Sequence, residues 1–241
     1  MSRAVRAVLM AAGIGKRMQP VSLDIPKPLI PVNGKAMIET VIEGLHSNGI
    51  YEIYIVVGYQ KEQFELLREK YKTITLIENP YFNVSNNISS LYVARDYIEN
   101  AIIMDGDQIL HNYKILTPEF ERSGYCSAWN SEETKEWMQT VKDGIVVDCS
   151  RIGGKNAWQL FSVSFWCQKD ALQLKELTKI EFETHRNWNI YWDDIPLFLY
   201  KEKFRLAIRK IRMGDITEID SYEELIKVDK SYRNYEKRSE V

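Results

Sequence analysis

Short apolar runs alternate with helical patterns through the first half of this chain, and this alternation restricts the folds that it can adopt. Buried strands are predicted at residues 5–11, 51–57, 73–77 and 101–104. Between them, apolar side chains recur at helical spacing in residues 37–45, 64–71 and 91–98. Strand-helix-strand repetition of this kind predicts a mostly parallel sheet that is covered by helices on both faces.

The pattern changes after residue 107, where strand-like segments follow one another with turn residues between them. These segments are predicted at residues 126–130, 137–141, 145–148, 159–166, 205–211 and 216–221. Helical patterns occur near residues 168–180 and 194–203, and a charged surface helix that frays is predicted from about Lys227. The 241 residues contain no internal repeat or obvious linker, so we expect a single α/β domain with a mixed second half.

Charge and composition exclude several classes of function. The chain has 32 basic and 34 acidic residues, a net charge of −2, which gives no electrostatic basis for binding nucleic acid. The three cysteines, Cys126, Cys149 and Cys167, lack metal-site spacing and are expected to be reduced thiols. No apolar stretch approaches the ~18 residues of a membrane span, and the N-terminal apolar run enters a Gly-Lys-Arg loop instead of a cleavage site. We therefore expect a cytoplasmic protein without membrane insertion.

A loop with two glycines directly follows the first predicted strand and carries the sequence AAGIGKRMQP. Gly13 and Gly15 lack a Cβ, so their backbone N–H groups can approach phosphate oxygens closely. Lys16, Arg17 and Lys27 add positive charge beside the loop. Ligands of open parallel sheets bind beyond the carboxyl ends of the strands, which is where this loop lies. An ordinary strand-to-helix turn remains the alternative on these residues alone.

Two familiar phosphate-binding motifs do not fit this loop. A dinucleotide fingerprint requires a third glycine where the chain has Met18. A Walker loop requires a Gly-Lys pair followed by serine or threonine after a fixed spacing, which this loop does not provide. The loop therefore indicates another class of phosphate-binding protein.

Two pairs of acidic residues are candidates for a metal site. Asp105 and Asp107 end the strand at residues 101–104, and residues at positions i and i+2 of an extended segment point to the same side. Glu218 and Asp220 have the same spacing in the segment ITEID. Mg²⁺ prefers hard oxygen ligands and often links one or two carboxylates to substrate phosphates. An ordinary turn after a strand, and a solvated strand edge, are the alternatives.

The string AAGIGKRM-x-P, with IPKPL downstream, resembles the signature of the sugar-phosphate and choline-phosphate nucleotidyltransferases. This resemblance implies a Rossmann-like three-layer αβα sandwich with a mixed, mostly parallel central sheet and a small C-terminal acceptor-binding part. The nucleotide-binding half would span about residues 1–110, the acceptor-binding half about 111–230, and a charged tail 231–241. Serine at position 22, where many members have threonine, is a departure from the family pattern.

The resemblance also implies roles for individual residues. Arg17 and Lys27 would act on the reacting phosphates as catalytic residues, and Asp107 and Asp220 would bind Mg²⁺. The nucleotide would be bound by Ala11, Ala12, Gly13, Gly15, Gly58, Tyr59, Asn87, Ser89 and Asp105. For Asn87 and Ser89 a pure helix-capping role is the alternative, and Asp105 could be structural.

Three further segments, TKEW, YWDD and EID, resemble the bacterial choline-phosphate cytidylyltransferases, and this likeness extends along nearly the whole chain. It implies that Trp137, Tyr191, Asp194 and Glu218 surround the ammonium group of the acceptor. Aromatic faces attract quaternary ammonium, and a nearby carboxylate adds charge complementarity. For any one aromatic residue, ordinary core packing is the alternative.

The expected reaction is transfer of CMP from CTP to phosphocholine, which gives CDP-choline and pyrophosphate by Mg²⁺-assisted in-line attack. No general base is required, because a phosphomonoester is largely ionised at neutral pH. Three alternatives stay open: the same reaction on 2-aminoethylphosphonate or phosphoethanolamine, a sugar-1-phosphate nucleotidyltransferase, and a nucleotide-binding regulator without catalysis. The carboxylates suit a primary ammonium and the aromatic residues a quaternary one, so the sequence does not separate the amines.

Overall fold

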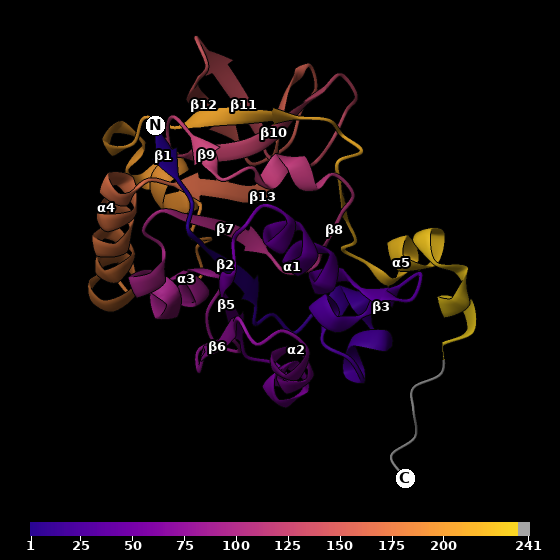
Figure 1. Ribbon diagram of the computed structural model, residues 1–241. Coiled ribbons are helices and arrows are strands. Elements are labelled where there is room, and N and C mark those ends of the chain that lie inside the picture. Colours follow the sequence, from indigo (N-terminus) through magenta and orange to yellow (C-terminus); the bar gives the residue numbers. More distant parts are fainter. Residues whose placement is uncertain (236–241) are drawn as a thin grey trace.

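A mixed sheet of nine strands forms the centre of the computed structural model, which describes residues 1–235 (Figure 1). Four neighbouring strands of this sheet run parallel, as the first half of the sequence predicts. In spatial order they are β6 (Ile74–Glu78), β5 (Glu52–Val57), β2 (Arg6–Ala11) and β7 (Ala101–Asp105). The predicted strand positions in this half are therefore confirmed to within about one residue.

Alternating side chains of β2 enter two separate cores. Leu9 and Ala11 belong to the core that includes residues of α1, whereas Val8 and Met10 belong to the core that includes residues of α3 and α4. The helices are α1 (Met37–Ser47), α2 (Glu65–Lys70), α3 (Ile88–Ala94), α4 (Gln168–Lys179) and α5 (Tyr222–Val228). Helices thus cover both faces of the sheet, and the predicted three-layer sandwich is confirmed (Figure 1).

The second half completes the sheet with antiparallel and parallel strands. Strand β13 (Ala157–Trp166) pairs antiparallel with β7 and also contacts β10 (Gly124–Asn130) and β11 (Met138–Lys142). Strands β12 (Ile145–Ser150) and β14 (Ala207–Ile211) complete this part.

Three short two-stranded sheets lie outside the main sheet. They pair β1 (Ser2–Arg3) with β9 (Glu119–Phe120), β3 (Pro31–Val32) with β4 (Lys35–Ala36), and β8 (Gln108–Leu110) with β15 (Ile216–Glu218). The pairing of β8 with β15 brings the segments that follow Asp107 and precede Asp220 side by side.

Single turns of 3₁₀ or π helix connect these elements. The 3₁₀ turns are Lys16–Met18, Val21–Leu23, Lys27–Leu29, Lys61–Phe64, Arg95–Tyr97, Tyr113–Leu116, Lys201–Lys203 and Lys230–Asn234. A π turn, Ile180–Thr184, extends α4. The helical pattern predicted near residues 194–203 is confirmed in part, because this segment forms the π turn Ile195–Leu199 and the 3₁₀ turn Lys201–Lys203 instead of one regular α-helix. Pro196 removes one backbone donor there.

The C-terminal segment differs from the fraying surface helix that is predicted from about Lys227, because helix α5 ends at Val228 and only the 3₁₀ turn Lys230–Asn234 follows it within the described residues. Helix α5 begins with a capping box formed by Ser221 and Glu224. Beyond it, Tyr232 is buried and donates a hydrogen bond of 2.7 Å to the carbonyl oxygen of Pro31. The prediction for residues 236–241 falls outside the described part of the chain.

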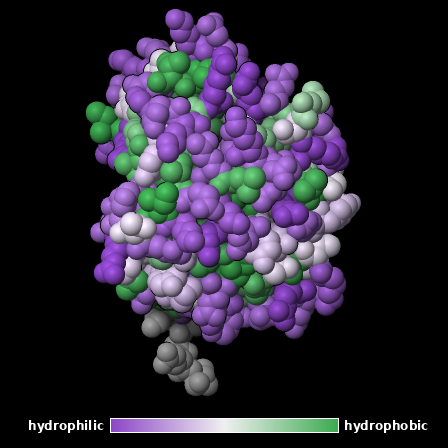
Figure 2. Space-filling model, turned by 90° about the vertical axis from the view of Figure 1, so that its left-hand side faces the viewer, coloured by the Kyte–Doolittle hydropathy of each residue, from purple (hydrophilic) through white to green (hydrophobic). Residues whose placement is uncertain are grey.

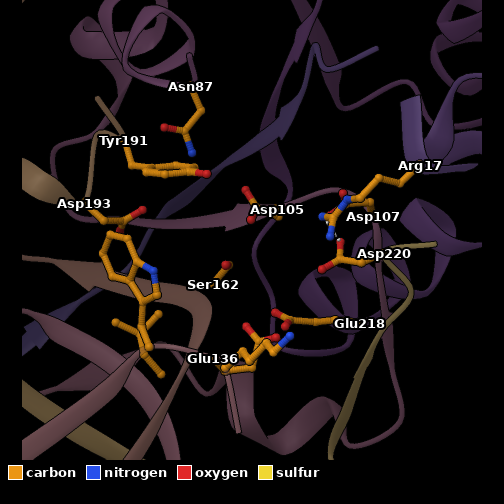
Figure 3. A pocket seen from close by; sticks show the side chains of 13 residues that line it. Arg17, Asn87, Asp105, Asp107, Glu136, Ser162, Tyr191, Asp193, Glu218 and Asp220 are labelled. Carbon is orange, nitrogen blue, oxygen red and sulfur yellow. Dashed lines mark ion pairs between the residues drawn. The ribbon is translucent and has the colours of Figure 1, made fainter. Parts of the chain in front are cut away.

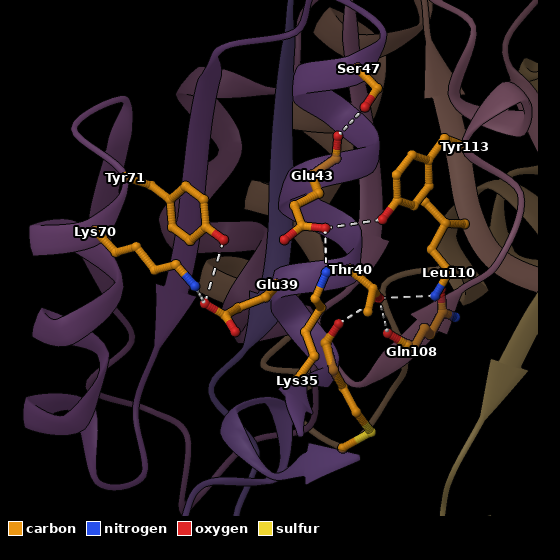
Figure 4. Close-up of polar contacts among 11 residues, drawn as sticks. Lys35, Glu39, Thr40, Glu43, Ser47, Lys70, Tyr71, Gln108, Leu110 and Tyr113 are labelled. Atoms are coloured by element: carbon orange, nitrogen blue, oxygen red, sulfur yellow. Dashed lines mark hydrogen bonds and ion pairs between the residues drawn. The ribbon is translucent and has the colours of Figure 1, made fainter. Parts of the chain in front are cut away.

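A threonine on α1 connects this helix to β8 (Figure 4). The Thr40 hydroxyl donates to the carbonyl oxygen of Met37 at 2.7 Å and accepts from the backbone N–H of Leu110 at 3.0 Å. The neighbouring Gln108 donates from Nε2 to a carboxylate oxygen of Glu218 at 2.7 Å. Helix α1 thereby helps to fix the two-stranded sheet that carries Glu218.

The surface in Figure 2 is mainly hydrophilic, with small and separate hydrophobic areas. Among residues 1–235, no helix combines the length and the apolar character needed to cross a membrane.

Candidate active site

Two cavities meet near the carboxyl ends of β2 and β7, the edge where open parallel sheets bind ligands. The first, which we call the aromatic cavity, has a volume of about 420 Å³. It is lined by Arg17, Asn87, Asp105, Asp107, Lys135, Glu136, Trp137, Leu160, Ser162, Tyr191, Asp193, Glu218 and Asp220 (Figure 3). The second, the glycine-loop cavity, has a volume of about 380 Å³. It is lined by Met10, Ala11, Gly13, Gly15, Lys16, Arg17, Lys27, Pro28, Asn86, Asp107 and Asp220.

Three charged residues belong to both cavities: Arg17, Asp107 and Asp220. Figure 3 shows them together on one side of the aromatic cavity, opposite Tyr191 and Asp193. A ligand in one cavity would therefore approach a ligand in the other at this shared charged edge.

The glycine loop depends on a glycine at position 15. Gly15 has a φ of 66°, in the left-handed region that favours glycine. A Cβ placed on it would lie only 3.1 Å from Cβ of Lys27. The Ser22 hydroxyl donates a 2.8 Å hydrogen bond to the carbonyl oxygen of Gly15. Serine and threonine share this hydroxyl, so the departure at position 22 preserves the contact.

Lys27 is a buried cation that holds two aspartates of the shared edge. Its Nζ atom lies 2.7 Å from Oδ2 of Asp107 and 2.8 Å from Oδ1 of Asp220. Burial lowers the pKa of Lys27, but the two carboxylates outweigh burial and raise the pKa above its usual value. Burial raises the pKa of Asp220, but Lys27 and Arg17, whose Nη2 lies 3.4 Å away, hold the pKa below its ordinary range. Lys27 and Asp220 are therefore both charged at neutral pH.

Two further carboxyl groups in the aromatic cavity have raised pKa values. Burial, followed by the charges of Asp107 and Asp193, raises the pKa of Asp105 well above its usual value. Burial, followed by the charges of Asp107 and Glu136, raises the pKa of Glu218 to about 7. Positive charge placed among such groups favours their ionised forms. The cavity is therefore electrostatically suited to a cation.

Two aromatic rings form the wall opposite the shared edge. The rings of Trp137 and Tyr191 meet edge to face, with centroids 5.7 Å apart and an interplanar angle of 86°. Asp193 lies beside Tyr191 (Figure 3). It accepts a 2.8 Å hydrogen bond from the buried hydroxyl of Tyr125. Burial raises the pKa of Asp193 to about 7. This wall thus combines two aromatic rings with a half-buried carboxyl group.

The structure places Asp193, rather than the predicted Asp194, in the aromatic cavity. The Asp194 side chain is 4% exposed and forms an ion pair of 2.6 Å with Arg151. Its other oxygen accepts from the backbone N–H of Tyr191 at 3.0 Å. Asp194 therefore supports the aromatic wall from behind and does not contribute to the cavity surface.

The polar residues at the start of α3 divide between the cavity and the core. Asn87 lines the aromatic cavity, and its Oδ1 accepts from the backbone N–H of Trp192 at 2.9 Å. The Ser89 side chain is buried outside both cavities, where it donates to the carbonyl oxygen of Asn86 at 2.8 Å and accepts from Nδ2 of Asn79 at 3.0 Å. Ser89 is predicted to contact the nucleotide, but in the structure its side chain forms local hydrogen bonds outside both cavities.

Three other predicted nucleotide contacts line neither cavity: Ala12, which belongs to the glycine loop, and Gly58 and Tyr59, which lie against it. The backbone N–H of Tyr59 donates to the carbonyl oxygen of Ala12 at 3.1 Å. A Cβ on Gly58 would lie 2.7 Å from the side chain of Phe82 and 2.9 Å from that carbonyl oxygen. Gly58 is thus required for close packing here, whereas Ala11, Gly13 and Gly15 do line the glycine-loop cavity.

Several cavity residues were not predicted from the sequence: Asn86, Lys135, Glu136, Ser162 and Asp193. A signal existed for Ser162, because it follows Leu160 at the i+2 spacing of β13 and both residues line the aromatic cavity. No comparable spacing distinguishes the others, which come from loops.

The shared edge offers oxygen ligands for a divalent cation. Asp107 and Asp220 approach the same Lys27 Nζ, so their carboxylates lie together at an open cavity. Within residues 1–235, no group of three or more His, Cys, Asp or Glu side chains forms a complete metal site. Two carboxylates without further protein ligands fit Mg²⁺, which retains waters and takes its other ligands from phosphates.

The fold and the site together match one class, the α/β enzymes with a glycine loop and charged side chains at the carboxyl ends of parallel strands. Residues 6–124 match the family described as Nucleotidyl transferase. A 2-aminoethylphosphonate cytidylyltransferase from Lancefieldella rimae is 35% identical over 94% of this chain and 92% of its own length. A choline-phosphate cytidylyltransferase from Streptococcus pneumoniae is 31% identical over 95% of this chain and 99% of its own length.

A solved structure of the CTP:phosphocholine cytidylyltransferase from Streptococcus pneumoniae matches this fold with a TM-score of 0.83, at 31% identity, over 95% of this chain and 99% of that one. This chain belongs to the nucleotidyl transferase family, and it is a nucleotidyltransferase whose full-length relatives include cytidylyltransferases.

Proposed function

We infer that this enzyme transfers CMP from CTP to a small phosphorylated amine, with phosphocholine as the leading acceptor. One observation carries this inference: the aromatic cavity, with its two rings and many carboxyl groups, shares a charged edge with the glycine-loop cavity. CTP would occupy the glycine-loop cavity and the amine would occupy the aromatic cavity. Their phosphates would then meet at Arg17, Asp107 and Asp220.

The charges of the aromatic cavity favour an acceptor that carries a cation. Six carboxyl groups line it, against two basic side chains, Arg17 and Lys135. Tyr191 supplies an aromatic face at the end away from the shared edge (Figure 3), and the ring of Trp137 packs against it. A cation near such faces gains about 0.5–2 kcal/mol, depending on how far it is desolvated. A sugar phosphate would leave both the rings and the carboxylates without matching groups.

The acceptor phosphate supplies its own nucleophile. The second pKa of this phosphate is near 6, so the phosphate is mainly a dianion at neutral pH. Its attacking oxygen therefore needs no general base. That oxygen forms a new bond to the α-phosphorus of CTP while the bond from this phosphorus to the bridging oxygen breaks. Pyrophosphate leaves with the electron pair, and CDP-amine is the product. The enzyme contributes mainly by positioning and by stabilising charge.

Lys27 and Arg17 are the cations that stabilise this charge. Lys27 Nζ is fixed by two carboxylates at the shared edge, so little reorganisation is needed when phosphate oxygens arrive. Arg17 is largely exposed and borders both cavities, which suits a side chain that closes over bound phosphates. Its planar guanidinium can bind two phosphate oxygens at once.

Asp107 and Asp220 would hold Mg²⁺. When bound, the ion neutralises negative charge on phosphate oxygens.

A second acceptor, 2-aminoethylphosphonate, is favoured by two observations. The 35% identical relative from Lancefieldella rimae acts on this compound by name. Asp105, Ser162 and Asp193 also provide several hydrogen-bond acceptors in one cavity, and a primary ammonium donates hydrogen bonds where trimethylammonium cannot. The two acceptors differ most in how strongly their ammonium groups depend on contact with the rings of Trp137 and Tyr191.

Kinetic assays with one acceptor at a time distinguish these acceptors. Purified enzyme, CTP and Mg²⁺ are combined with phosphocholine, phosphoethanolamine, 2-aminoethylphosphonate or glucose 1-phosphate, and pyrophosphate release is followed. We expect the highest kcat/KM with phosphocholine, at least about tenfold above phosphoethanolamine. A higher kcat/KM with 2-aminoethylphosphonate would assign the second acceptor. Release only with the sugar phosphate would contradict the amine proposal.

A further inference from the structure

Three segments meet on the side of the aromatic wall that faces away from the cavity. They are the residues before β11, the turn after β12, and the residues that lead into the π turn Ile195–Leu199. The side chain that contacts both of the other segments is Arg151, the first residue after β12. Arg151 does not line the aromatic cavity.

Arg151 makes three contacts at this junction. Its guanidinium carbon lies 3.9 Å from the ring centroid of Phe198 and 5.7 Å from that of Trp137. Its Nη2 forms the 2.6 Å ion pair with Asp194. The rings of Trp137 and Phe198 also meet edge to face, with centroids 5.4 Å apart. One guanidinium therefore contacts Trp137, its neighbouring ring and a buried carboxylate.

Asp194 extends these contacts to the second ring of the wall. Its Oδ2 accepts from the backbone N–H of Tyr191 at 3.0 Å, a local bond that fixes the turn carrying this tyrosine. Burial raises the pKa of Asp194, while the Tyr191 N–H and Arg151 act in the opposite direction. Removing Arg151 would leave a buried carboxylate without its cation, which is costly.

The turn that carries Arg151 is itself held closely against the segment before Trp137. Thr134 and Gly154 exchange backbone hydrogen bonds of 2.9 and 3.0 Å. Gly153 has a φ of 82°, and a Cβ on it would lie 1.9 Å from the carbonyl oxygen of Thr134. Only glycine permits this approach. The position of Arg151 relative to Trp137 is thus set by backbone contacts.

We propose that Arg151 and Asp194 form a positioning pair that holds the rings of Trp137 and Tyr191 in the arrangement that binds the ammonium group of the acceptor. This inference rests on the proposed function. The pair touches neither the cavity nor the reacting phosphates, so it acts through the two rings. Its loss should weaken binding of the amine and leave binding of CTP nearly unchanged.

The test compares Arg151→Met, Arg151→Lys and Asp194→Asn with the wild-type enzyme. Arg151→Met keeps a flexible apolar stem but removes the charge and the planar group. Arg151→Lys restores the charge without the planar contact, and the two groups are not interchangeable at stacked sites. Arg95→Met is the matched control, because Arg95 also lies over a ring, 4.1 Å from the centroid of Tyr92, but outside both cavities.

We expect Arg151→Met and Asp194→Asn each to raise KM for the preferred amine about tenfold, with KM for CTP changed less than twofold. Arg151→Lys should recover part of this loss. The double variant Arg151→Met/Asp194→Asn should have a KM for the amine no higher than that of the more impaired single variant, because the two residues act as a unit. Arg95→Met should behave as wild type.

Equal rises in KM for the amine and KM for CTP would overturn the positioning role. Effects of the two substitutions that add together in the double variant would also overturn it. Unchanged KM for the amine in folded Arg151→Met would overturn it as well. The Arg151 side chain is 46% exposed, so its loss opens no cavity in the core, and Arg151→Lys keeps a cation beside Asp194. Wild-type enzyme that transfers CMP to no amine would instead contradict the proposed function. In that event, titration calorimetry of phosphocholine with wild type and Arg151→Met tests the pair alone: weaker binding by the variant supports it, and equal or absent binding refutes it.

Discussion

The Nζ atom of Lys27 lies 2.8 Å from Oδ1 of Asp220, although 193 positions separate the two residues in the sequence. Lys27 belongs to the turn after the glycine loop, and Asp220 follows the short strand β15. This contact joins the first and last parts of the chain at the shared edge of the two cavities.

Lys27→Met should abolish most turnover. The substitution removes a fixed cation that faces the reacting phosphates, and losses of about 100-fold or more in kcat are typical of such groups. Pyrophosphate release at saturating CTP and amine measures the effect. Lys16→Met is the matched control: Lys16 lines the same cavity but is exposed, and we expect a much smaller loss. Equal losses in the two variants would refute a special role for Lys27.

Asp107→Asn and Asp220→Asn should each increase the Mg²⁺ concentration needed for half-maximal activity and lower kcat. Both substitutions replace an anionic oxygen ligand with a neutral amide, which hard cations bind less well. A Mg²⁺ titration of turnover checks this prediction. Asp148→Asn, at an aspartate with a 71% exposed side chain outside both cavities, should titrate as wild type. Wild-type Mg²⁺ dependence in both site variants would show that other residues hold the ion.

Trp137→Ala should raise KM for the amine far more than KM for CTP, by about tenfold if the ring provides a desolvated cation contact. Trp129→Ala removes a half-exposed tryptophan that packs against Trp158, outside the aromatic cavity, and should have little effect on either KM. A parallel rise in both KM values for Trp137→Ala would indicate general disruption of the site.

Glu218→Gln should change how stability depends on pH. The pKa of Glu218 is raised from 4.5 to about 7 in the folded protein, so its contribution to stability is present below pH 4.5 and is lost as pH rises through 7. Glutamine cannot ionise, so the ligand-free variant should melt at a higher temperature than wild type at pH 8, by about 3 °C or more. Near pH 4.5 this advantage should disappear. Thermal melts across this range would contradict the raised pKa if the two proteins kept a constant difference.

Ser89→Ala should lower stability without changing substrate binding. The variant loses the bond to the Asn86 carbonyl and leaves Asn79 with fewer partners, at a cost of about 1–2 kcal/mol. Urea unfolding measures this cost, and KM for CTP should stay within twofold of wild type. A large rise in KM for CTP, with stability unchanged, would restore Ser89 as a nucleotide contact.

Periodicity predicted the central sheet well because alternate residues of β2 enter two cores, and such a strand is apolar throughout. It could not choose between Asp193 and Asp194, since both lie in a turn where no strand or helix period fixes the direction of a side chain. Ser89 was equally ambiguous, because the polar residues that begin helices are also the ones that bind ligands. The docking of Tyr232 depends on a surface from the start of the chain, which local composition does not describe.

A ³¹P NMR spectrum of a single reaction shows whether CMP is transferred between two ligands that meet at the shared edge. With CTP, Mg²⁺ and phosphocholine, we predict that the phosphocholine signal is replaced by a pair of coupled signals from a pyrophosphate diester, CDP-choline, as free pyrophosphate appears in equal amount. CTP that stays intact, or that yields CMP and pyrophosphate with every acceptor phosphate unchanged, would contradict CMP transfer by this enzyme.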